Sequence, residues 1–224
     1  MDALTPRRQR VIRGMDADQR REERRKQLLA ATFDLIASNG YANTSIEQIC
    51  QTAYVGNKAF YELFDSKEDC YLALLTQMAE QIQRQVQRVM MLSSGVDDDD
   101  IVGRLVSAFA HALVDDPRVA VVAFGEAAGI SPRVERQRRQ NRRGAASFIE
   151  EFWRARFRAD IGRESDVDYH ALAVSTVGGL FEAVADWLQQ ADPHKPRTVD
   201  TLVSELTAFV TVVQAGLAAR ISAI

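Results

Sequence analysis

Cysteine is scarce in this chain, which has only two among its 224 residues. Cys50 and Cys70 are separated by 19 residues, and two thiols do not make a disulfide framework in a protein of this size. No group of metal-binding side chains accompanies either one in the sequence. The sequence therefore predicts two buried, free thiols, with a redox pair as the less favoured alternative.

Catalytic signatures are also missing. The histidines His111, His170 and His194 are dispersed, and none forms a metal-binding pair on one helix face. The sequence has no glycine-rich phosphate loop, no nucleophile elbow and no Cys-x-x-Cys motif. We therefore expect no catalytic residues, no metal and no cofactor. A helical-bundle enzyme or small-molecule carrier stays open as the alternative, because bundles build sites from residues distant in sequence.

Long hydrophobic runs are absent as well. We expect no apolar leader segment at the start of the sequence and no apolar run that reaches membrane-spanning length. Hydrophobic residues still make up 46% of the chain, which is enough for a substantial core. A chain of this length accommodates one large domain and one small one. We expect a cytoplasmic protein with no membrane partner.

Charge is unevenly distributed. The formal net charge is -3, but residues 1–67 hold eleven Lys or Arg against nine Asp or Glu, and the remainder is acidic. A basic N-terminal end on an acidic body suits contact with DNA at one end only. Residues 1–17 read as a flexible basic arm. A disordered, solvated tail is favoured over an arm that enters the minor groove through Arg7, Arg8, Arg10 and Arg13.

The stretch from Thr44 to Lys67 has the pattern of two short helices around a tight turn, followed by the start of a longer helix. Ser45 is a natural N-cap, and Gln48 is placed to complete a capping box with it. Gly56 lies in the break, where backbone freedom is useful. Ser66 is the expected N-cap of the longer helix.

The second short helix, expected over residues 57–63, is too short to be stable by itself in water. Neighbouring helices must hold it through Phe60 and Phe64, which leaves its outer side chains free to contact a binding partner. The major groove of DNA admits one α-helix, and helix-turn-helix units place their second helix there. We favour this interpretation over a helical hairpin buried in a bundle. The outward-facing residues are Asn57, Lys58, Tyr61 and Glu62.

The segments GYANTSIEQIC and VGNKAFYELFDSKEDCYLALL resemble the N-terminal domain of TetR-family transcriptional regulators. The resemblance covers about residues 25–75 and consists of many spaced matches, which makes it a specific signal. Three positions depart from the family pattern. Tyr54 stands where Gly is usual, Lys58 where Gly or Ala is usual, and Leu63 where His or Tyr is usual.

The resemblance implies an all-α protein, with a three-helix helix-turn-helix domain over residues 18–66 and an effector-binding and dimerisation domain over residues 67–224. Side-chain chemistry and the matching motif positions together assign roles in DNA binding. The candidates for base edges are Asn57, Lys58 and Glu62. The candidates for phosphates are Thr44, Ser45, Tyr61 and Lys67.

Apolar spacing predicts the helices around and after this motif. We interpret the arginine run between residues 133 and 143 as a solvated helix face. The expected helices cover residues 18–38 and 67–92, a stripe from Val102 to Leu113, an apolar segment from Pro117 placed inside the body, and residues 132–160, 167–190 and 198–222.

The last two expected helices are apolar on more than one side, so each needs two partners. We expect a homodimer through these helices, as the family resemblance also implies, bound to palindromic double-stranded operator DNA. The same resemblance implies an unknown small-molecule effector that releases a repressor from its operator. Aromatic residues of the body are the candidates to line a largely hydrophobic effector pocket, with a packed core as the alternative. They are Phe109, Phe124, Phe148, Phe152, Trp153 and Phe181.

Overall fold

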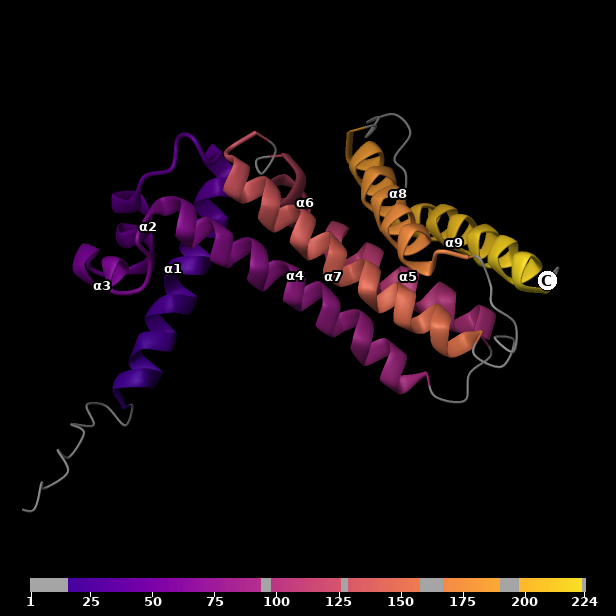
Figure 1. Cartoon of the computed structure of the whole chain (residues 1–224). Coiled ribbons are helices and arrows are strands. Elements are labelled where there is room, and N and C mark those ends of the chain that lie inside the picture. The colour runs from indigo at the N-terminus through magenta and orange to yellow at the C-terminus, as the bar shows by residue number, and fades with distance from the viewer. Residues whose placement is uncertain (1–15, 94–97, 126–128, 158–166, 190–197, 223–224) are drawn as a thin grey trace, which may run out of the picture. The chain divides into compact units, whose positions relative to one another are not determined.

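A computed structural model describes residues 16–93, 98–125, 129–157, 167–189 and 198–222 (Figure 1). The basic arm predicted over residues 1–17, with Arg7, Arg8, Arg10 and Arg13, lies almost entirely outside these ranges. Within them the regular structure is helical throughout, which confirms the expected all-α class. The elements are α1 (Ala17–Asn39), α2 (Ile46–Ala53), α3 (Asn57–Tyr61), α4 (Lys67–Leu92), α5 (Asp98–Val114), α6 (Pro117–Ala120), η1 (Val121–Gly125), α7 (Pro132–Arg156), α8 (Tyr169–Gln189) and α9 (Val199–Ser222).

The chain divides into two compact units, one ending at Leu74 and one beginning at Leu75. We call the first the head and the second the body. The boundary falls inside α4, so the head includes the first residues of that helix.

The head is built around buried side chains from all four of its helical segments. Leu28 and Ile36 of α1, Ile49 of α2, Phe60 of α3 and Tyr71 of α4 are each fully buried. Helix α3 has five residues, too few for a stable isolated helix, so burial of Phe60 is what keeps it in place.

Side-chain caps define where the head helices begin. The Ser45 hydroxyl accepts from the Gln48 backbone N–H at 3.2 Å, and the Gln48 side chain accepts from the Ser45 N–H at 2.7 Å. The Ser66 hydroxyl accepts from the Asp69 N–H at 3.1 Å. Both predicted caps are thus confirmed, and each satisfies backbone donors that the first turn of a helix leaves unpaired.

Both cysteines are buried, free thiols in the head, as predicted. The Cys70 sulfur lies 3.2 Å from the Thr32 hydroxyl, whose oxygen is also 2.7 Å from the Leu28 carbonyl. Burial raises the pKa of Cys70 to about 11, so this thiol stays protonated at neutral pH. It is a core side chain and not a nucleophile.

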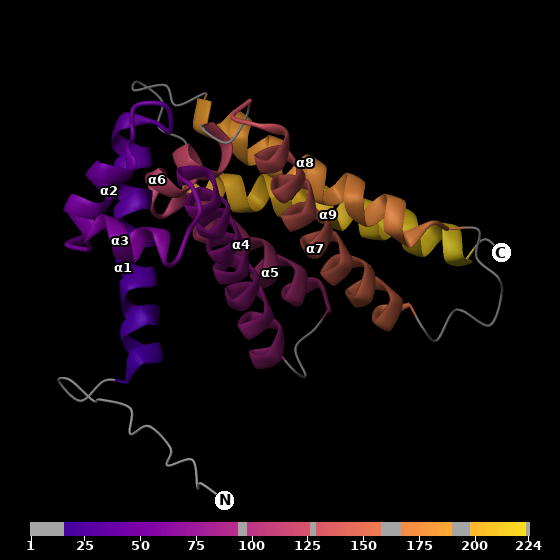
Figure 2. The same ribbon diagram turned by 60° about the vertical axis from the view of Figure 1, so that its left-hand side comes forward.

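In the body, α5 packs along α9 and α7 packs along α8 (Figure 1 and Figure 2). One buried cluster joins α5 to α8 and α9, with Val106, Leu180 and Leu206 among its members. A second joins α7 to the same two helices through Trp153, Val177 and Leu217. Helices α8 and α9 therefore contribute to both cores of the body.

The helix expected from Pro117 differs from the observed one. Helix α6 spans four residues and continues as the π-helical segment η1. Val122 is fully buried, but Val121 beside it is exposed, so this apolar stretch is only partly inside the body. A run of apolar residues predicts burial on all sides, and here the chain leaves one side open to solvent.

Helices α8 and α9 are long and apolar enough to cross a membrane by length and composition, which corrects our expectation that no segment reaches that size. Only 28% of each apolar window is buried within the chain. Val174 of α8 and Phe209 and Val212 of α9 are exposed large hydrophobic residues. These two helices thus carry apolar surface that the body itself does not cover.

The turn between α2 and α3 contains a strained residue. Tyr54 caps α2 in the left-handed region, with φ 54° and ψ 37°, and no other non-glycine residue of the described ranges has a positive φ. An L-residue there costs roughly 1–2 kcal/mol, because Cβ crowds the following carbonyl. The side chain is 97% exposed, so packing does not offset the strain. The turn keeps the conformation in which glycine is usual.

We predict that Tyr54→Gly stabilises the head. Relief of the left-handed strain exceeds the entropic cost of glycine in the unfolded chain, for a net gain of about 0.5–1 kcal/mol in the free energy of unfolding. Denaturant titration followed by circular dichroism measures it. Tyr54→Ala is the matched control, which keeps Cβ and should stay within about 0.5 kcal/mol of the parent. A lower stability for Tyr54→Gly would contradict the strain argument.

Candidate functional site

Helix α3 has one buried face and one exposed face. Phe60 is fully buried and packs edge-on against the Tyr61 ring, with ring centroids 5.5 Å apart. Phe64 continues the same buried face. The four residues predicted to point outward, Asn57, Lys58, Tyr61 and Glu62, are all exposed. The head therefore presents a short helix whose outer surface has an amide, an ammonium, a phenol and a carboxylate.

Two of the residues predicted for phosphate contacts have other partners in the head. Thr44 is 2% exposed, and its hydroxyl donates to the Gly40 carbonyl at 2.9 Å. The Lys67 ammonium donates to the carbonyls of Tyr41 at 2.8 Å and Thr44 at 2.7 Å, and lies 4.2 Å from the Tyr41 ring centroid. Burial lowers the pKa of Lys67.

These contacts give Thr44 and Lys67 a role in holding the loop between α1 and α2 next to the start of α4. Their contact with phosphate stays a prediction. Ser45 is exposed at the N-terminus of α2, where its hydroxyl caps the helix. A helix N-terminus favours anions, so this position suits a phosphate.

Arg21 was not among the predicted site residues. Its guanidinium donates to the carbonyl of Glu62, at the end of α3, at 3.4 Å. The two residues are 41 positions apart in the sequence, which gave no signal of this contact. It brings a cation from α1 to the helix that carries the outward-facing set.

The body contains a cavity of about 310 Å³. Helices α4, α5, α7, α8 and α9 and the segment η1 all contribute to its wall. All six aromatic residues predicted to line a pocket do line this one: Phe109, Phe124, Phe148, Phe152, Trp153 and Phe181. Two of them, Phe109 and Phe124, pack against the Phe181 ring at centroid distances of 5.3 Å and 5.5 Å.

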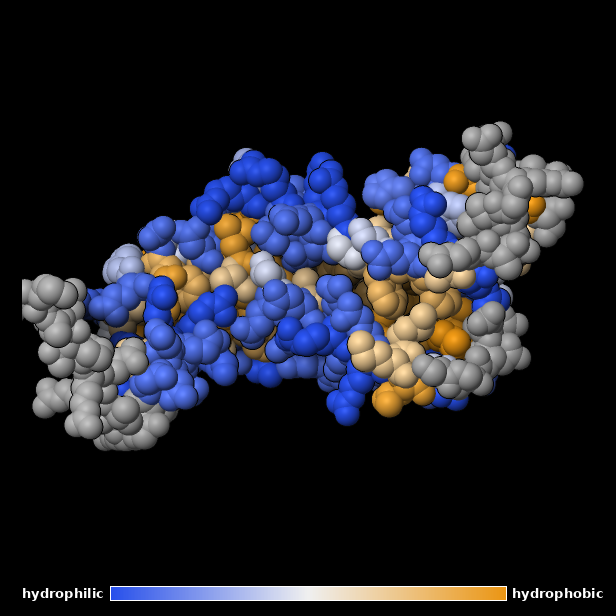
Figure 3. All heavy atoms as spheres, turned by 60° about the horizontal axis from the view of Figure 1, so that its bottom comes forward, coloured by the Kyte–Doolittle hydropathy of each residue, from blue (hydrophilic) through white to orange (hydrophobic). Residues whose placement is uncertain are grey.

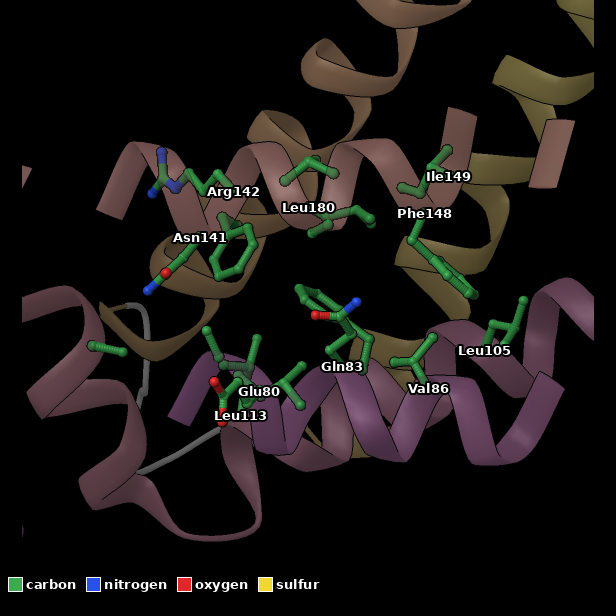
Figure 4. Close-up of a pocket in the computed structure, with 18 of the residues that line it drawn as sticks. Glu80, Gln83, Val86, Leu105, Leu113, Asn141, Arg142, Phe148, Ile149 and Leu180 are labelled. Atoms are coloured by element: carbon green, nitrogen blue, oxygen red, sulfur yellow. The ribbon is translucent and has the colours of Figure 1, made fainter. Parts of the chain in front are cut away.

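The polar groups of this cavity are not spread evenly. Figure 4 shows Arg142 and Asn141 at one end, Phe148 and Ile149 at the other, and Gln83 between them. The Arg142 guanidinium lies 5.1 Å from the Phe181 ring centroid. Burial lowers the pKa of Arg142, and the nearby charge of Arg138 lowers it further. The cavity is therefore apolar along most of its length, with the cation Arg142 at one end and the carboxylate of Glu80 also in its wall.

Arg138 and Asn141, which also line the cavity, have polar partners that Arg142 lacks. Arg138 forms an ion pair with Glu135 at 2.9 Å, and the Asn141 amide donates to the Leu75 carbonyl at 3.2 Å. No ion pair or hydrogen bond joins Arg142 to another residue of the described ranges. A guanidinium on a ring face with unused donors suits a planar anion.

The arginine run of α7 corrects one prediction. Arg133, Arg136, Arg139 and Arg143 are exposed, as a solvated face requires, but Arg138 and Arg142 are half-buried and line the cavity. The helical spacing of four residues between these two placed them on one face. The sequence alone did not show that this face meets the body interior, because the neighbouring arginines mask it.

Within the described ranges, no three His, Cys, Asp or Glu residues are grouped in a way that would hold a metal ion. The site therefore consists of two separate features, one in each unit. The head offers a polar helix face, and the body offers an apolar cavity with a cationic end.

Comparison with known proteins identifies the head. Residues 28–74 match the family model for bacterial regulatory proteins of the tetR family, and this range contains all seven residues predicted to contact DNA. The chain is also similar to the HTH-type transcriptional activator FasR of Mycolicibacterium smegmatis. The two are 23% identical over 176 residues, which cover 77% of this chain and 76% of that protein.

Solved structures share the fold over most of the chain. A putative TetR-family transcriptional regulator from Syntrophomonas wolfei aligns with a TM-score of 0.68 and 20% identity, covering 86% of this chain and 95% of that one. The transcriptional regulator FadR from Bacillus subtilis, solved in complex with stearoyl-CoA, aligns with a TM-score of 0.66 and 17% identity. That alignment covers 82% of this chain and 95% of the other.

Proposed function

The chain belongs to the TetR family of DNA-binding transcriptional regulators, and from this premise we propose that it is a dimeric repressor released from a palindromic operator by a long-chain acyl ligand. The family consists of regulators and not of enzymes, so the enzyme alternative is set aside. The observation that carries the proposal is the cavity of the body, with six aromatic residues in its wall and Arg142 at one end.

In the head, the proposal places α3 in the major groove. Lys58 suits the acceptors on guanine, Asn57 can pair with adenine, and Glu62 can accept from the amino group of cytosine. Tyr61 and Ser45 suit phosphates, which set the position of the helix but read no sequence. All five of these residues are exposed, so each side chain is accessible to the duplex.

In the body, the proposal places an acyl chain along the apolar part of the cavity and an anionic head near Arg142. The polar head group of such a ligand is the carboxylate of a fatty acid or the phosphates of coenzyme A. A guanidinium can bind either group. The stearoyl-CoA complex of Bacillus subtilis FadR supports this class of ligand through shared fold. The side chains of the wall support it through chemistry, because the cations Arg138 and Arg142 stand in a mostly apolar lining.

The uncovered faces of α8 and α9 support a homodimer. Val212 is 71% exposed, and Gly178 of α8 has open space around the position of a side chain. Small residues such as glycine allow two helices to approach closely, and the large apolar residues beside them then bury apolar surface area. A second copy of the same two helices would complete a four-helix interface, in which one apolar patch faces its own image.

A membrane is the other environment that would cover these faces, and charge argues against it. Glu182 and Asp186 of α8 and Glu205 of α9 are exposed along the same helices. Each would cost roughly 2.5 kcal/mol or more in the centre of a bilayer. In a dimer they can remain at the wet rim of the interface.

We predict that Lys58→Ala and Tyr61→Phe weaken operator binding. Selection from random duplex DNA at fixed salt would first supply the operator, expected to be palindromic with half-sites about one helical turn apart. Loss of a base contact at Lys58 costs about 1–3 kcal/mol, a drop in affinity of roughly 5- to 150-fold, and loss of a phosphate contact at Tyr61 costs less. Fluorescence anisotropy measures both.

Arg136→Ala is the matched control for these variants, because it removes an exposed cation from the body. It should leave the affinity unchanged within about twofold. Equal affinity for Lys58→Ala and the parent protein would remove Lys58 from the interface. Failure to select any motif would contradict sequence-specific binding.

We predict that Val212→Glu separates the dimer. A carboxylate at an apolar helix interface loses hydration without a partner, so association weakens by several kcal/mol. Sedimentation velocity should show the parent as a dimer and this variant as a monomer that no longer binds the operator tightly. Leu92→Glu is the matched control, since Leu92 of α4 is similarly exposed at 74%. A dimeric Val212→Glu protein would move the interface elsewhere.

We predict that palmitoyl-CoA or palmitate releases the protein from its operator. Anisotropy of labelled operator DNA, titrated with each compound separately, shows which head group acts. Arg142→Gln should raise the concentration needed for release by roughly tenfold or more, because it removes the charged anchor. Arg143→Gln, at the exposed neighbouring position, should not. Release by neither compound would overturn the proposed ligand class.

A further inference from the structure

One polar side chain of the cavity wall has no partner that explains its burial. Gln214 of α9 is 7% exposed, lines the cavity, and its Nε2 has no hydrogen-bond partner among the described residues. The side-chain oxygen makes no hydrogen bond to the described residues either, but it is not fully buried. A buried amide nitrogen without a hydrogen-bond partner destabilises the folded protein, so it persists only where something offsets that cost.

Gln214 and Arg142 line the cavity from different helices, α9 and α7. Val213 and Leu217 of α9 pack with the cluster of α7 and α8 that contains Trp153 and Val177. The cavity wall therefore has a cation on α7 and an unpaired amide on α9, with apolar side chains around them.

The neighbourhood of Gln214 gives it no other function. Val212, two residues before Gln214, and Ala215, the residue after it, are exposed, while Gln214 itself is buried. The amide therefore belongs to the cavity wall and not to the outer surface that the proposed dimer would use. Leu or Met at this position would fill the same space without an unmet hydrogen bond.

Building on the proposed acyl ligand, we propose that Gln214 selects a chain bearing a second oxygen, apart from its anionic head. A hydroxyl fits best, because it both donates and accepts and so satisfies the amide oxygen and the amide nitrogen together. The ligand class is then a hydroxylated long-chain acyl compound. A plain saturated chain of equal length leaves the amide unpaired, and a site built this way rejects such an analogue.

The test compares palmitic acid with its terminally hydroxylated counterpart of the same chain length, using the full-length protein and isothermal titration calorimetry. The parent protein should bind the hydroxylated acid roughly tenfold more tightly or better. The Gln214→Leu protein should lose that preference and bind the plain acid at least as well as the parent does. Its melting temperature should rise, because a buried unpaired amide is removed.

A second variant guards against misfolding of the first. Gln214→Met has an unbranched side chain of similar length and should behave as Gln214→Leu does. The parent protein also decides the question without any variant. Equal affinity for the two acids, or tighter binding of the plain one, would overturn the selection by Gln214 while leaving the proposed acyl ligand intact. If neither acid nor palmitoyl-CoA binds, the proposed ligand class and this inference are both overturned.

Discussion

Helix α3 has five residues and no stability of its own, so the function of the head depends on the burial of Phe60. A helix of this length would unfold if its inner side lost contact with α1, α2 and the start of α4. Only because those elements hold Phe60 and Phe64 can the remaining side chains of α3 be polar and exposed. The proposed contact of α3 with DNA requires this separation of a buried face from an exposed polar face.

The need to hold α3 in place also accounts for the hydrogen bonds that fix the backbone around it. Lys67 is the first residue of α4, and its ammonium ties the carbonyls of Tyr41 and Thr44 to that helix. Arg21 holds the carbonyl of Glu62 at the other end of the motif. These cations of the head stabilise backbone carbonyls. A count of basic residues therefore overstates how many of them are available to phosphates.

Much of the head was predictable from sequence because its determinants are local. Caps at Ser45 and Ser66, the break before Gly56 and the apolar spacing around Phe60 each act over a few residues. The position of Tyr54 was harder to interpret, since a bulky residue where glycine is usual predicts a changed turn. The structure keeps the turn and places the strain on Tyr54 instead.

The cavity was predictable only in part, for a different reason. Its aromatic residues were identifiable by composition, and all six meet in one place because α5, α7, α8 and the segment η1 bring their apolar faces together. Arg142 and Gln214 were not identified. Arg142 stands in a run of exposed arginines, and Gln214 stands in an apolar helix where one polar residue usually faces solvent. Both become distinctive only when the packing of distant helices is known.

The polar groups of the cavity can make the affinity for a ligand depend on the conformation of the body, which the apolar wall does much less. An apolar wall binds a chain through area alone, at roughly 25 cal/mol per Å², in whichever conformation keeps that area. A ligand shifts an equilibrium only by its difference in affinity for the two states, and a change from about 1:99 to about 99:1 requires about 5.5 kcal/mol. Hydrogen bonds and charge pairs depend steeply on geometry, so small shifts of α7 or α9 alter them far more than they alter apolar contact. Arg142 and Gln214, which we propose determine ligand specificity, are therefore also the residues best suited to make ligand binding depend on conformation.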